Sequence, residues 1–329
     1  MMKTVDVVVP LYNEENLVDE LVRRLQSATA ELSYSFRFIM VDDGSRDNTL
    51  AKIKAHQERD QRIIVISLSR NWGHQCAFNA GIDYADADAV ILMDGDLEDP
   101  PEMISDFIKH WENGADVVYA KKNSRVESRF KKLLYRIFYS LMRRFSNVTI
   151  EKQVGMFSLL DRRAHAELKK CSEHNKYYVG LRSFVGFKQV QISYERHKRF
   201  SGKPKQTLDK LLTYGMNAIF SFSFLPMRLL TSFGIFLLGT IATVSTILFF
   251  ARLFRFNFWP FYVLPGWTSL VLILLFISSI QLIFLGVIGE YVARVYDETR
   301  HRPHYIINRI YTAEHALQKS DTEELVISR

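Results

Sequence analysis

Four carboxylates follow an apolar run in the segment ILMDGDLEDPP: Asp94, Asp96, Glu98 and Asp99. The apolar run reads as the end of a buried strand. Asp94 and Asp96 stand one residue apart at this extended end, so both can approach one hard divalent ion, and Glu98 can close on it from the next turn. Magnesium takes few protein carboxylates and completes its shell with phosphate oxygens and water. The spacing therefore predicts a Mg²⁺ or Mn²⁺ site at Asp94, Asp96 and Glu98.

Two other apolar runs also end in acidic residues. The first run ends in PLYNEE, with Tyr12 and Glu14, and the second ends in VDDGSRDNT, with Asp42 and Asp43. Three acidic clusters at one edge of a sheet would repel one another unless a cation or a donor-rich ligand lay between them. The alternative for any one of them is a helix cap or a turn, and the residues 47–48 before TLAKI fit that alternative.

Other motifs exclude several classes of site. The segment DGDLEDPPEMIS lacks the glycine and the terminal glutamate of an EF-hand loop, and the chain has neither GxxxxGK[ST] nor GxGxxG. The two cysteines, Cys76 and Cys171, have no CxxC partner, so neither a zinc site nor a disulfide framework is indicated. A formal net charge of +7 favours anionic partners, among them nucleic acid, phospholipid and phosphorylated substrates.

The elements that must position these acids alternate along the first 120 residues. Continuously apolar runs predict strands at 5–12, 36–41, 62–67, 89–93 and 115–120. Helical patterns between them predict helices at about 15–32, 49–59, 75–84 and 101–113. This alternation predicts an α/β fold with an open, mostly parallel sheet that is covered on both faces. Ligands of such sheets bind beyond the carboxyl ends of the strands, where the acids lie.

The second half of the chain carries two stretches without charge, at 233–251 and 270–289. Each has about the 20 residues that a membrane-spanning helix needs, and the alternative is a pair of buried core helices. Basic residues before the first stretch and after the second place both ends in the cytoplasm by the positive-inside rule. We therefore expect a multi-pass protein of the inner (cell) membrane, with both termini and the catalytic domain cytoplasmic.

A basic amphipathic pattern covers residues 129–145, RFKKLLYRIFYSLMRRF. Large apolar residues recur at helical spacing while Lys and Arg fill the other face, which is typical of a helix lying in a membrane interface. The alternative is an ordinary amphipathic helix packed on the sheet. A nucleic-acid partner is disfavoured because the basic residues alternate with large aliphatic ones instead of lining a polar groove. The stretch 208–224 is expected to lie along the membrane in the same way.

Four ordered segments over about 100 residues resemble glycosyltransferase family 2: VVVPLYNEE, VDDGSRDNT, RNWGHQCAFNAG and the D-x-D segment DGDLEDPP. Within that family the chain is similar to the polyprenyl-phosphate glycosyltransferases. RFSGKPK (199–205) resembles their R-x-x-G-x-S-K loop, with Pro204 where serine is usual. GVIGEYVARVYDETRHRPHYII (286–307) resembles the end of their bacterial membrane-anchored members.

The resemblance implies a Rossmann-like fold of the GT-A type and a nucleotide-sugar donor. Asp94 and Asp96 would be the catalytic residues, and Asp94, Asp96 and Glu98 would hold Mg²⁺ or Mn²⁺. The donor would be bound by Pro10, Tyr12, Glu14, Val41, Asp42, Asp43 and Asp94. The donor diphosphate and the phosphate of a polyprenyl acceptor would be bound by Arg125, Arg129, Lys132, Arg199 and Lys205. The alternative for any of these basic residues is a solvated or lipid-facing charge.

One segment departs from the family pattern. Bacterial relatives often carry D-x-G-D-F after the amphipathic helix, whereas this chain reads QVGMF, with Gln153 and Met156 at the acidic positions. The family inverts the anomeric centre in one displacement, and a phosphate monoester needs no general base because it is mostly dianionic at neutral pH. Either the acceptor phosphate attacks unaided, or another carboxylate assists. Asp161 is near in sequence, but it fits a helix cap equally well.

The hypothesis that follows is an inverting, metal-dependent transfer of a hexose, glucose from UDP-glucose, to undecaprenyl phosphate at the cytoplasmic leaflet. The alternatives are the same chemistry with mannose or a modified arabinose, a processive synthase, for which the chain lacks a Q-x-x-R-W motif, and a non-catalytic membrane scaffold. We expect membrane lipids as partners, and a homo-oligomer is possible through glycines of the spans. The predicted regions are a donor-binding core (1–125), an acceptor region (126–225), a transmembrane hairpin (226–295) and a cytoplasmic tail (296–329).

Overall fold

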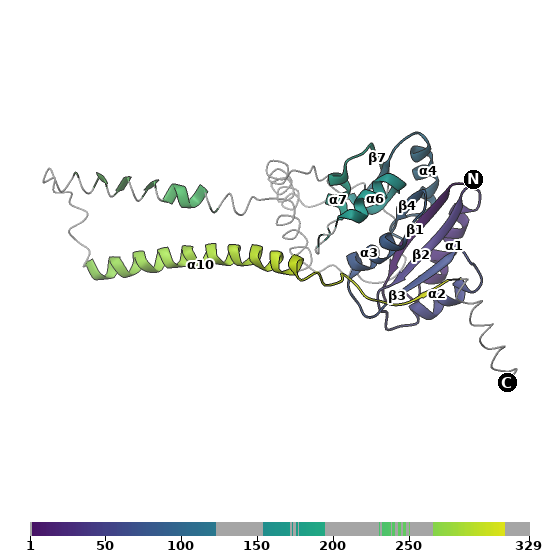
Figure 1. Ribbon diagram of the computed structural model, residues 1–329, viewed down its shortest axis with the longest axis horizontal. Coiled ribbons are helices and arrows are strands. Elements are labelled where there is room, and N and C mark those ends of the chain that lie inside the picture. Colours follow the sequence, from purple (N-terminus) through teal and green to yellow (C-terminus); the bar gives the residue numbers. More distant parts are fainter. Residues whose placement is uncertain are drawn as a thin grey trace.

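The computed structural model describes residues 2–122, residues 154–194 apart from 172, 174, 175 and 177, separate positions between 230 and 250, and residues 266–312. The predicted amphipathic stretches 129–145 and 208–224 lie outside these residues. The fold is therefore described from the sheet, the helices that cover it and the long helix near the C-terminus (Figure 1).

The described residues form one eight-stranded sheet with the order β7-β5-β6-β4-β1-β2-β3-β8. Its strands are β1 (Thr4–Leu11), β2 (Ser35–Asp42), β3 (Ile63–Leu68), β4 (Ala89–Leu92), β5 (Val117–Lys122), β6 (Val154–Asp161), β7 (Gln189–Tyr194) and β8 (Ile307–Tyr311). The first five confirm the five predicted strands. β1 pairs in parallel with β2 and β4, as β2 does with β3 and β5 with β7.

The sheet is more mixed than the sequence predicts. β6 lies antiparallel between β4 and β5, and β8 lies antiparallel on the outer side of β3. The sequence analysis missed β6, β7 and β8. The two outer ones, β7 and β8, are only partly buried, so QVQISY and INRIY lack the continuous apolar run of a central strand. Strands from three of the four predicted regions join one sheet, and the division into regions stays a prediction.

Helices cover both faces of the sheet. Neighbouring residues of a strand point to opposite faces, and in β1 the residues on both faces are apolar and buried. Val7 and Val9 of β1 pack with α1 (Val18–Thr29), α2 (Thr49–Gln57) and α4 (Ile104–Glu112). Val8 packs on the other face with α3 (His74–Tyr84), α6 (Arg162–Lys170) and α7 (Tyr178–Val185). Figure 1 shows these two layers on opposite sides of the strands. The four predicted helices are confirmed, although the last one begins with a short 3₁₀ turn, η1 (Pro101–Met103).

The close contact between α3 and β1 fixes where α3 begins. A Cβ atom on Gly81 would lie 2.2 Å from Cγ1 of Val8, so this position admits no larger side chain without movement. The glycine lets α3 lie directly on the central strand. Its first residue, His74, is thereby held at the carboxyl edge of the parallel strands.

A long apolar helix, α10 (Gly266–Thr299), projects away from the sheet (Figure 1). Its segment Phe276–Thr299 has a mean hydropathy of 1.7 and is not buried, and it is the one helix in the described part of the chain with the length and composition to cross a membrane. α10 contains the second predicted span. The first, 233–251, is described only at separate positions, so a pair of spans is not confirmed.

β8 connects α10 to the sheet at a defined edge. Ile307 pairs with Leu68 at the carboxyl end of β3, and the Ser69 N–H donates to the Ile306 carbonyl at 2.9 Å. The Tyr305 hydroxyl is 2.9 Å from Oδ2 of Asp83. The chain therefore returns from the apolar helix at the edge where β1, β2 and β4 also end.

Candidate functional site

The three acidic strand ends lie at one edge of the sheet, as the sequence predicts. Leu11 at the end of β1 pairs with Asp42 at the end of β2, and the Asp43 N–H donates to the Leu11 carbonyl at 2.9 Å. On the other side of β1, Val8 pairs with Leu92 of β4. The chain then leaves β4 toward Asp94, so the segments after these three strands are neighbours.

The glycine of the D-x-D motif lets the chain cross the end of β1. A Cβ atom on Gly95 would lie 2.5 Å from Cδ2 of Leu11 and 2.8 Å from the Pro10 carbonyl oxygen. A carbonyl oxygen of a central strand cannot move away easily. Gly95 is therefore required for the close approach that holds Asp94 and Asp96 against the end of β1.

The rest of this acidic loop, residues 94–100, is also ordered by specific contacts. Oδ1 of Asp96 accepts the Glu98 N–H at 3.1 Å. Between them Leu97 is 1% exposed and has a φ of 59°, which a leucine adopts at a cost. Asp99 is fully buried, and its carboxylate accepts the Tyr194 hydroxyl. Asp96 and Glu98 are left half-buried at the edge.

The acidic loop fits a divalent cation whose coordination shell is completed by substrate phosphates. Among the described residues there is no group of three His, Cys, Asp or Glu side chains placed to hold a metal ion. Asp96 and Glu98 are nevertheless hard oxygen donors, and Mg²⁺ in phosphate-transfer sites is bound by one or two carboxylates together with substrate phosphates. The predicted ligand set of Asp94, Asp96 and Glu98 stays a prediction.

The predicted donor-binding residue Asp43 also holds a neighbouring loop. Its two carboxylate oxygens accept the N–H groups of Trp72, at 2.7 Å, and Gly73, at 3.0 Å. The residue is 3% exposed, and this burial raises the pKa of its carboxyl although both hydrogen bonds lower it. Asp42 is likewise buried and accepts the Ser45 N–H at 3.3 Å. Asp43 thereby fixes the segment RNWG that leads into α3.

The loops after β1 and β2 are cross-linked to each other by short polar side chains. The Asn13 N–H donates to Oγ of Ser45 at 3.0 Å, and the Arg46 N–H donates to Oδ1 of Asn13 at 2.9 Å. Oδ1 of Asp47 accepts the Thr49 N–H at 3.0 Å at the start of α2. Of the predicted cap or turn at residues 47–48, the structure shows the turn, because Asn48 at the N-cap position makes no side-chain cap hydrogen bond.

Four predicted donor-binding residues line this cross-linked part of the edge. Pro10 and Val41 are buried, and each is the second-last residue of its strand, β1 or β2. Tyr12 and Glu14 are half-buried, and the Glu14 N–H donates to Oγ1 of Thr49 at 2.9 Å. The structure thus brings together every described member of the predicted donor set.

The sequence analysis assigned no role to His74, which contacts the acidic loop. Its Nε2 lies 3.0 Å from Oδ1 of Asp94, and its ring meets Phe78 edge-on with 4.9 Å between centroids. Burial lowers the pKa of the imidazole, but the hydrogen bond to Asp94 and the charges of Asp96 and Asp43 outweigh it and raise the pKa. The signal was a histidine at the first turn of a helix, directly after the glycine of RNWGHQ.

The structure rules out Asp161 as an assisting carboxylate. Asp161 pairs with Ala89 at the start of β4, the end remote from the acidic loop. Its Oδ1 caps α6 by accepting the Arg163 N–H at 2.9 Å, and its Oδ2 accepts the Trp111 indole N–H at 3.0 Å. The proposal that Asp161 assists the reaction is therefore wrong, because the side chain serves as a helix cap.

Met156, by contrast, lies toward the end of β4 that leads into the acidic loop. Leu92, the last residue of β4, pairs with Ser158 of β6, two residues after Met156. A methionine adds no negative charge at this end of β6. Gln153, the other departure from the family pattern, lies outside the described residues.

One buried cation near this end of β6 was also missed. Arg182 of α7 is 5% exposed, donates to the Gly155 carbonyl at 3.3 Å and stacks over the Tyr119 ring at 4.6 Å. The basic residues predicted to bind phosphate lie outside the described part of the chain: Arg125, Arg129, Lys132, Arg199 and Lys205.

Comparisons with known proteins agree with this arrangement. Residues 6–169 match the family model described as glycosyl transferase family 2. An uncharacterized glycosyltransferase of Bacillus subtilis (strain 168), YkcC, is 39% identical over 309 residues, which cover 94% of each chain. The bactoprenol glucosyl transferase of Shigella phage SfV is 34% identical and covers 92% of this chain and 97% of its own.

Among solved structures, the chain is similar to glucosyl-3-phosphoglycerate synthase from Mycobacterium tuberculosis in complex with Mn²⁺, UDP and glucosyl-3-phosphoglycerate. It has a TM-score of 0.49 and 18% identity, covering 66% of this chain and 77% of that one. The mixed α/β sheet agrees with the GT-A type of fold that the resemblance implies. Because the family model matches residues 6–169 and the Bacillus subtilis and Shigella phage relatives match almost the whole length, the chain belongs to glycosyltransferase family 2 and is a glycosyltransferase.

Proposed function

We propose that this glycosyltransferase moves a hexose from a nucleotide sugar to polyprenyl phosphate at the cytoplasmic leaflet of the cell membrane, with inversion at the anomeric carbon. The observation that carries the proposal is the acidic loop, which Gly95 holds across the end of β1 at the carboxyl edge. The name of the Shigella phage SfV relative supports glucose as the sugar and a bactoprenol acceptor. We accordingly expect UDP-glucose and undecaprenyl phosphate as the substrates.

The donor would bind along the carboxyl edge. Tyr12, Glu14 and Asp43 offer an aromatic face and carboxylate acceptors where a base and a ribose need them, above the buried floor of Pro10 and Val41. Asp42 supports this region through Ser45. The diphosphate would extend from there toward the acidic loop, since the segments after β2, β1 and β4 follow one another along the edge.

The acidic loop would then serve the leaving group. A divalent cation bound there supplies Lewis-acid stabilisation of the growing negative charge on the departing diphosphate. Asp96 and Glu98 would hold the cation, and His74 orients Asp94 beside them. The ligands of the cation would be oxygens of two or three carboxylates, which suits Mg²⁺ or Mn²⁺.

The acceptor would attack without a protein base. An oxygen of its phosphate forms a bond to the anomeric carbon, the bond from that carbon to the diphosphate oxygen breaks, and the electron pair leaves with the nucleoside diphosphate. The acceptor phosphate is mostly dianionic at neutral pH, so no proton has to be removed. Met156 at an acidic position of the family pattern and the capping role of Asp161 are compatible with this mode of attack.

The polyprenyl chain of the acceptor lies in the membrane, so the enzyme has to be bound to the membrane. Large apolar residues of α10 are exposed, among them Ile283, Leu285 and Ile288, and exposure of so many to water would be unfavourable. We propose that α10 crosses the membrane, that 233–251 forms a second span, and that both termini are cytoplasmic. Glycines along these spans, such as Gly286 and Gly289, leave room for a second copy of the chain to pack closely.

The test is a donor screen with the full chain in lipid nanodiscs. The protein is incubated with undecaprenyl phosphate and, in separate reactions, with UDP-glucose, UDP-galactose, UDP-N-acetylglucosamine, GDP-mannose or a UDP-linked modified arabinose. Mass spectrometry then identifies the lipid product, with Mg²⁺, with Mn²⁺ and with EDTA. We expect a metal-dependent glucosyl lipid.

The donor screen also separates the alternatives. A product from GDP-mannose or from the modified arabinose donor would keep the chemistry and change the sugar. No lipid product from any donor would overturn the proposed acceptor. An EDTA-insensitive product would overturn the role of the cation. Membership of a glycosyltransferase family already speaks against a non-catalytic scaffold.

A further inference from the structure

The acidic loop is held at both ends by residues that are remote in sequence. His74 contacts Asp94 at one end, and Tyr194 donates a hydrogen bond to Asp99 at the other. We propose that Tyr194 is a positioning residue that orients Asp96 and Glu98 through Asp99. This inference rests on the proposed function of the acidic loop, and it assigns a role to a side chain that is not among the predicted metal ligands.

Tyr194 is a rigid anchor. It is the last residue of β7, paired with Lys122 of β5, and it is 7% exposed. Its ring meets the ring of Phe157 edge-on, with 6.2 Å between centroids. Burial and the neighbouring Asp99 carboxylate raise the pKa of the phenol. The hydroxyl therefore stays protonated and donates a hydrogen bond to Asp99.

Asp99 needs such a donor. Its side chain is fully buried, and a buried carboxylate is tolerated when hydrogen bonds replace its lost hydration. The hydrogen bond joins residues that are 95 positions apart in the sequence. A bond of a hydroxyl to an ionised acceptor is stronger than one between neutral groups.

The acidic loop depends on anchors of this kind because its backbone is not intrinsically favourable. Leu97 is held at a φ of 59°, in the left-handed region that leucine rarely adopts. Its burial and the bond from the Glu98 N–H to Asp96 both require the loop to keep this shape. If Asp99 is released, the chain can return to an ordinary φ, and this turns Asp96 and Glu98 away from their present directions.

The two ends also lie far apart along the sheet edge. Gly95 touches the end of β1, whereas Tyr194 ends β7, and β4, β6 and β5 stand between these strands. The acidic loop therefore stretches across the ends of several strands. Asp96 and Glu98 lie between its two fixed points, so a change at either fixed point moves both carboxylates together.

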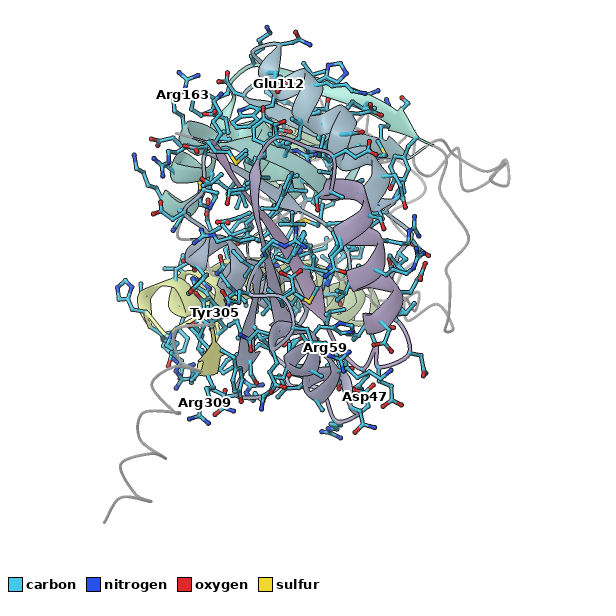
Figure 2. The ribbon with its side chains drawn as sticks, turned by 90° about the vertical axis from the view of Figure 1, so that its right-hand side faces the viewer. Asp47, Arg59, Glu112, Arg163, Tyr305 and Arg309 are labelled. Atoms are coloured by element: carbon cyan, nitrogen blue, oxygen red, sulfur yellow. The ribbon has the colours of Figure 1, made fainter. Side chains whose placement is uncertain are left out.

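The test compares Tyr194→Phe with a matched control, Tyr34→Phe. Tyr34 also donates its hydroxyl to a carboxylate, that of Glu112. Figure 2 shows Glu112 at the top of the view, where Arg163 is also labelled. Both substitutions remove one hydroxyl and keep the ring. They differ in whether the lost bond anchors the acidic loop.

Hydrogen–deuterium exchange of the full chain in nanodiscs gives a readout that is independent of turnover. The peptide that contains residues 94–100 includes the Glu98 N–H, which is bonded to Asp96. We expect its exchange to accelerate by about tenfold or more in Tyr194→Phe, since a bond to a charged group is lost. Tyr34→Phe should leave this peptide as in the wild type.

The metal requirement gives the second readout. For Tyr194→Phe, the Mn²⁺ concentration that gives half-maximal activity should rise about tenfold, while the KM for undecaprenyl phosphate stays unchanged. Asp99→Asn keeps an uncharged oxygen acceptor for the hydroxyl, so its effects should fall between those of the wild type and Tyr194→Phe. If Tyr194→Phe does not fold, Asp99→Asn must still exceed Tyr34→Phe in both measurements.

The outcomes separate this inference from the proposed function. Wild-type exchange and a wild-type metal requirement in Tyr194→Phe would overturn the positioning role alone. A loss of activity in Asp99→Asn as severe as in Asp96→Asn would also overturn it, because Asp99 would then act directly. Full activity of Asp96→Asn would instead show that the acidic loop is not the site of the reaction.

Discussion

Two segments at the same edge of the sheet are held in place by different means. The loops after β1 and β2 are cross-linked to each other by short polar side chains: Ser45 accepts the Asn13 N–H, and Asp47 accepts the Glu15 N–H. The acidic loop after β4 is held by remote contacts: Gly95 against β1, His74 of α3 and Tyr194 of β7.

The difference teaches where a change of sequence acts. A polar network with several members tolerates the loss of one bond, because the others keep the loop in place. The acidic loop contains a leucine in an unfavourable conformation, so we expect the loss of a remote anchor to change the direction of its carboxylates. We therefore expect substitutions near the acidic loop to affect chemistry, and those in the first network to affect mainly stability.

The largest expected effect comes from Asp96→Asn. This change removes one charge from the acidic loop and should lower kcat by about a hundredfold or more, the scale seen when an electrostatic stabiliser of a leaving group is lost. The thermal midpoint should change little because Asp96 is half-buried. The paired variant is Asp47→Asn in the first network, whose kcat should stay within a few-fold of the wild type. Equal losses in both variants would contradict the comparison.

Gly95→Ala should have the next largest effect. Its Cβ would lie within 2.8 Å of the Pro10 carbonyl oxygen, so the acidic loop must move away from β1. Overpacking of this kind costs about 1–3 kcal/mol of stability, and the displacement of Asp94 and Asp96 should lower kcat/KM by about tenfold or more. Thermal unfolding and steady-state kinetics measure the two effects. A variant with wild-type kinetics would show that the close approach is not needed.

Turn chemistry explains why the first network could be predicted from the sequence. Asp, Asn, Ser and Thr in VDDGSRDNT bond to nearby backbone groups, and the strands before them are continuous apolar runs. The turn formed by Asp47 and the acidic strand ends followed from these local patterns alone.

The anchors of the acidic loop could not be predicted, because they depend on which remote segments meet. The sequence does not show that β7, with its alternating pattern, joins the sheet, so Tyr194 gave no signal. His74 stood in a noted motif, but only the packing of Gly81 on Val8 brings α3 to Asp94. The antiparallel register of β6 likewise decides that Asp161 lies at the start of β4, away from the acidic loop.

Asp43→Asn tests the connection between the two segments and should have a smaller effect. An asparagine keeps one oxygen for the N–H of Trp72 or Gly73 but turns an amide donor toward the other. The mismatch should cost about 1–3 kcal/mol, because a buried N–H loses its acceptor. Exchange of the peptide spanning residues 70–74 should rise, with a decrease in UDP affinity by calorimetry. Unchanged exchange there would show that Asp43 does not hold this loop.

The smallest effect concerns the scaffold beneath both segments. His165 of α6 is 4% exposed, and its Nε2 lies 2.9 Å from the Ile82 carbonyl of α3. Burial lowers its pKa below the ordinary value of 6.5, with a further decrease from the charge of Lys169, while the hydrogen bond to Ile82 opposes this change.

The unfolded chain consequently binds a proton at His165 more readily than the folded one. The contribution of His165 to stability is therefore present above pH 6.5 and is lost as the pH falls through that value. His165→Gln should unfold at a lower temperature than the wild type at pH 7.5, and the difference should shrink at pH 5.5. His165 is bonded to α3, and the start of α3 contacts both segments through Gly73 with Asp43 and His74 with Asp94. Acid should therefore increase exchange in residues 94–100 and 43–49 alike, and a change in one segment alone would place the titrating group within that segment.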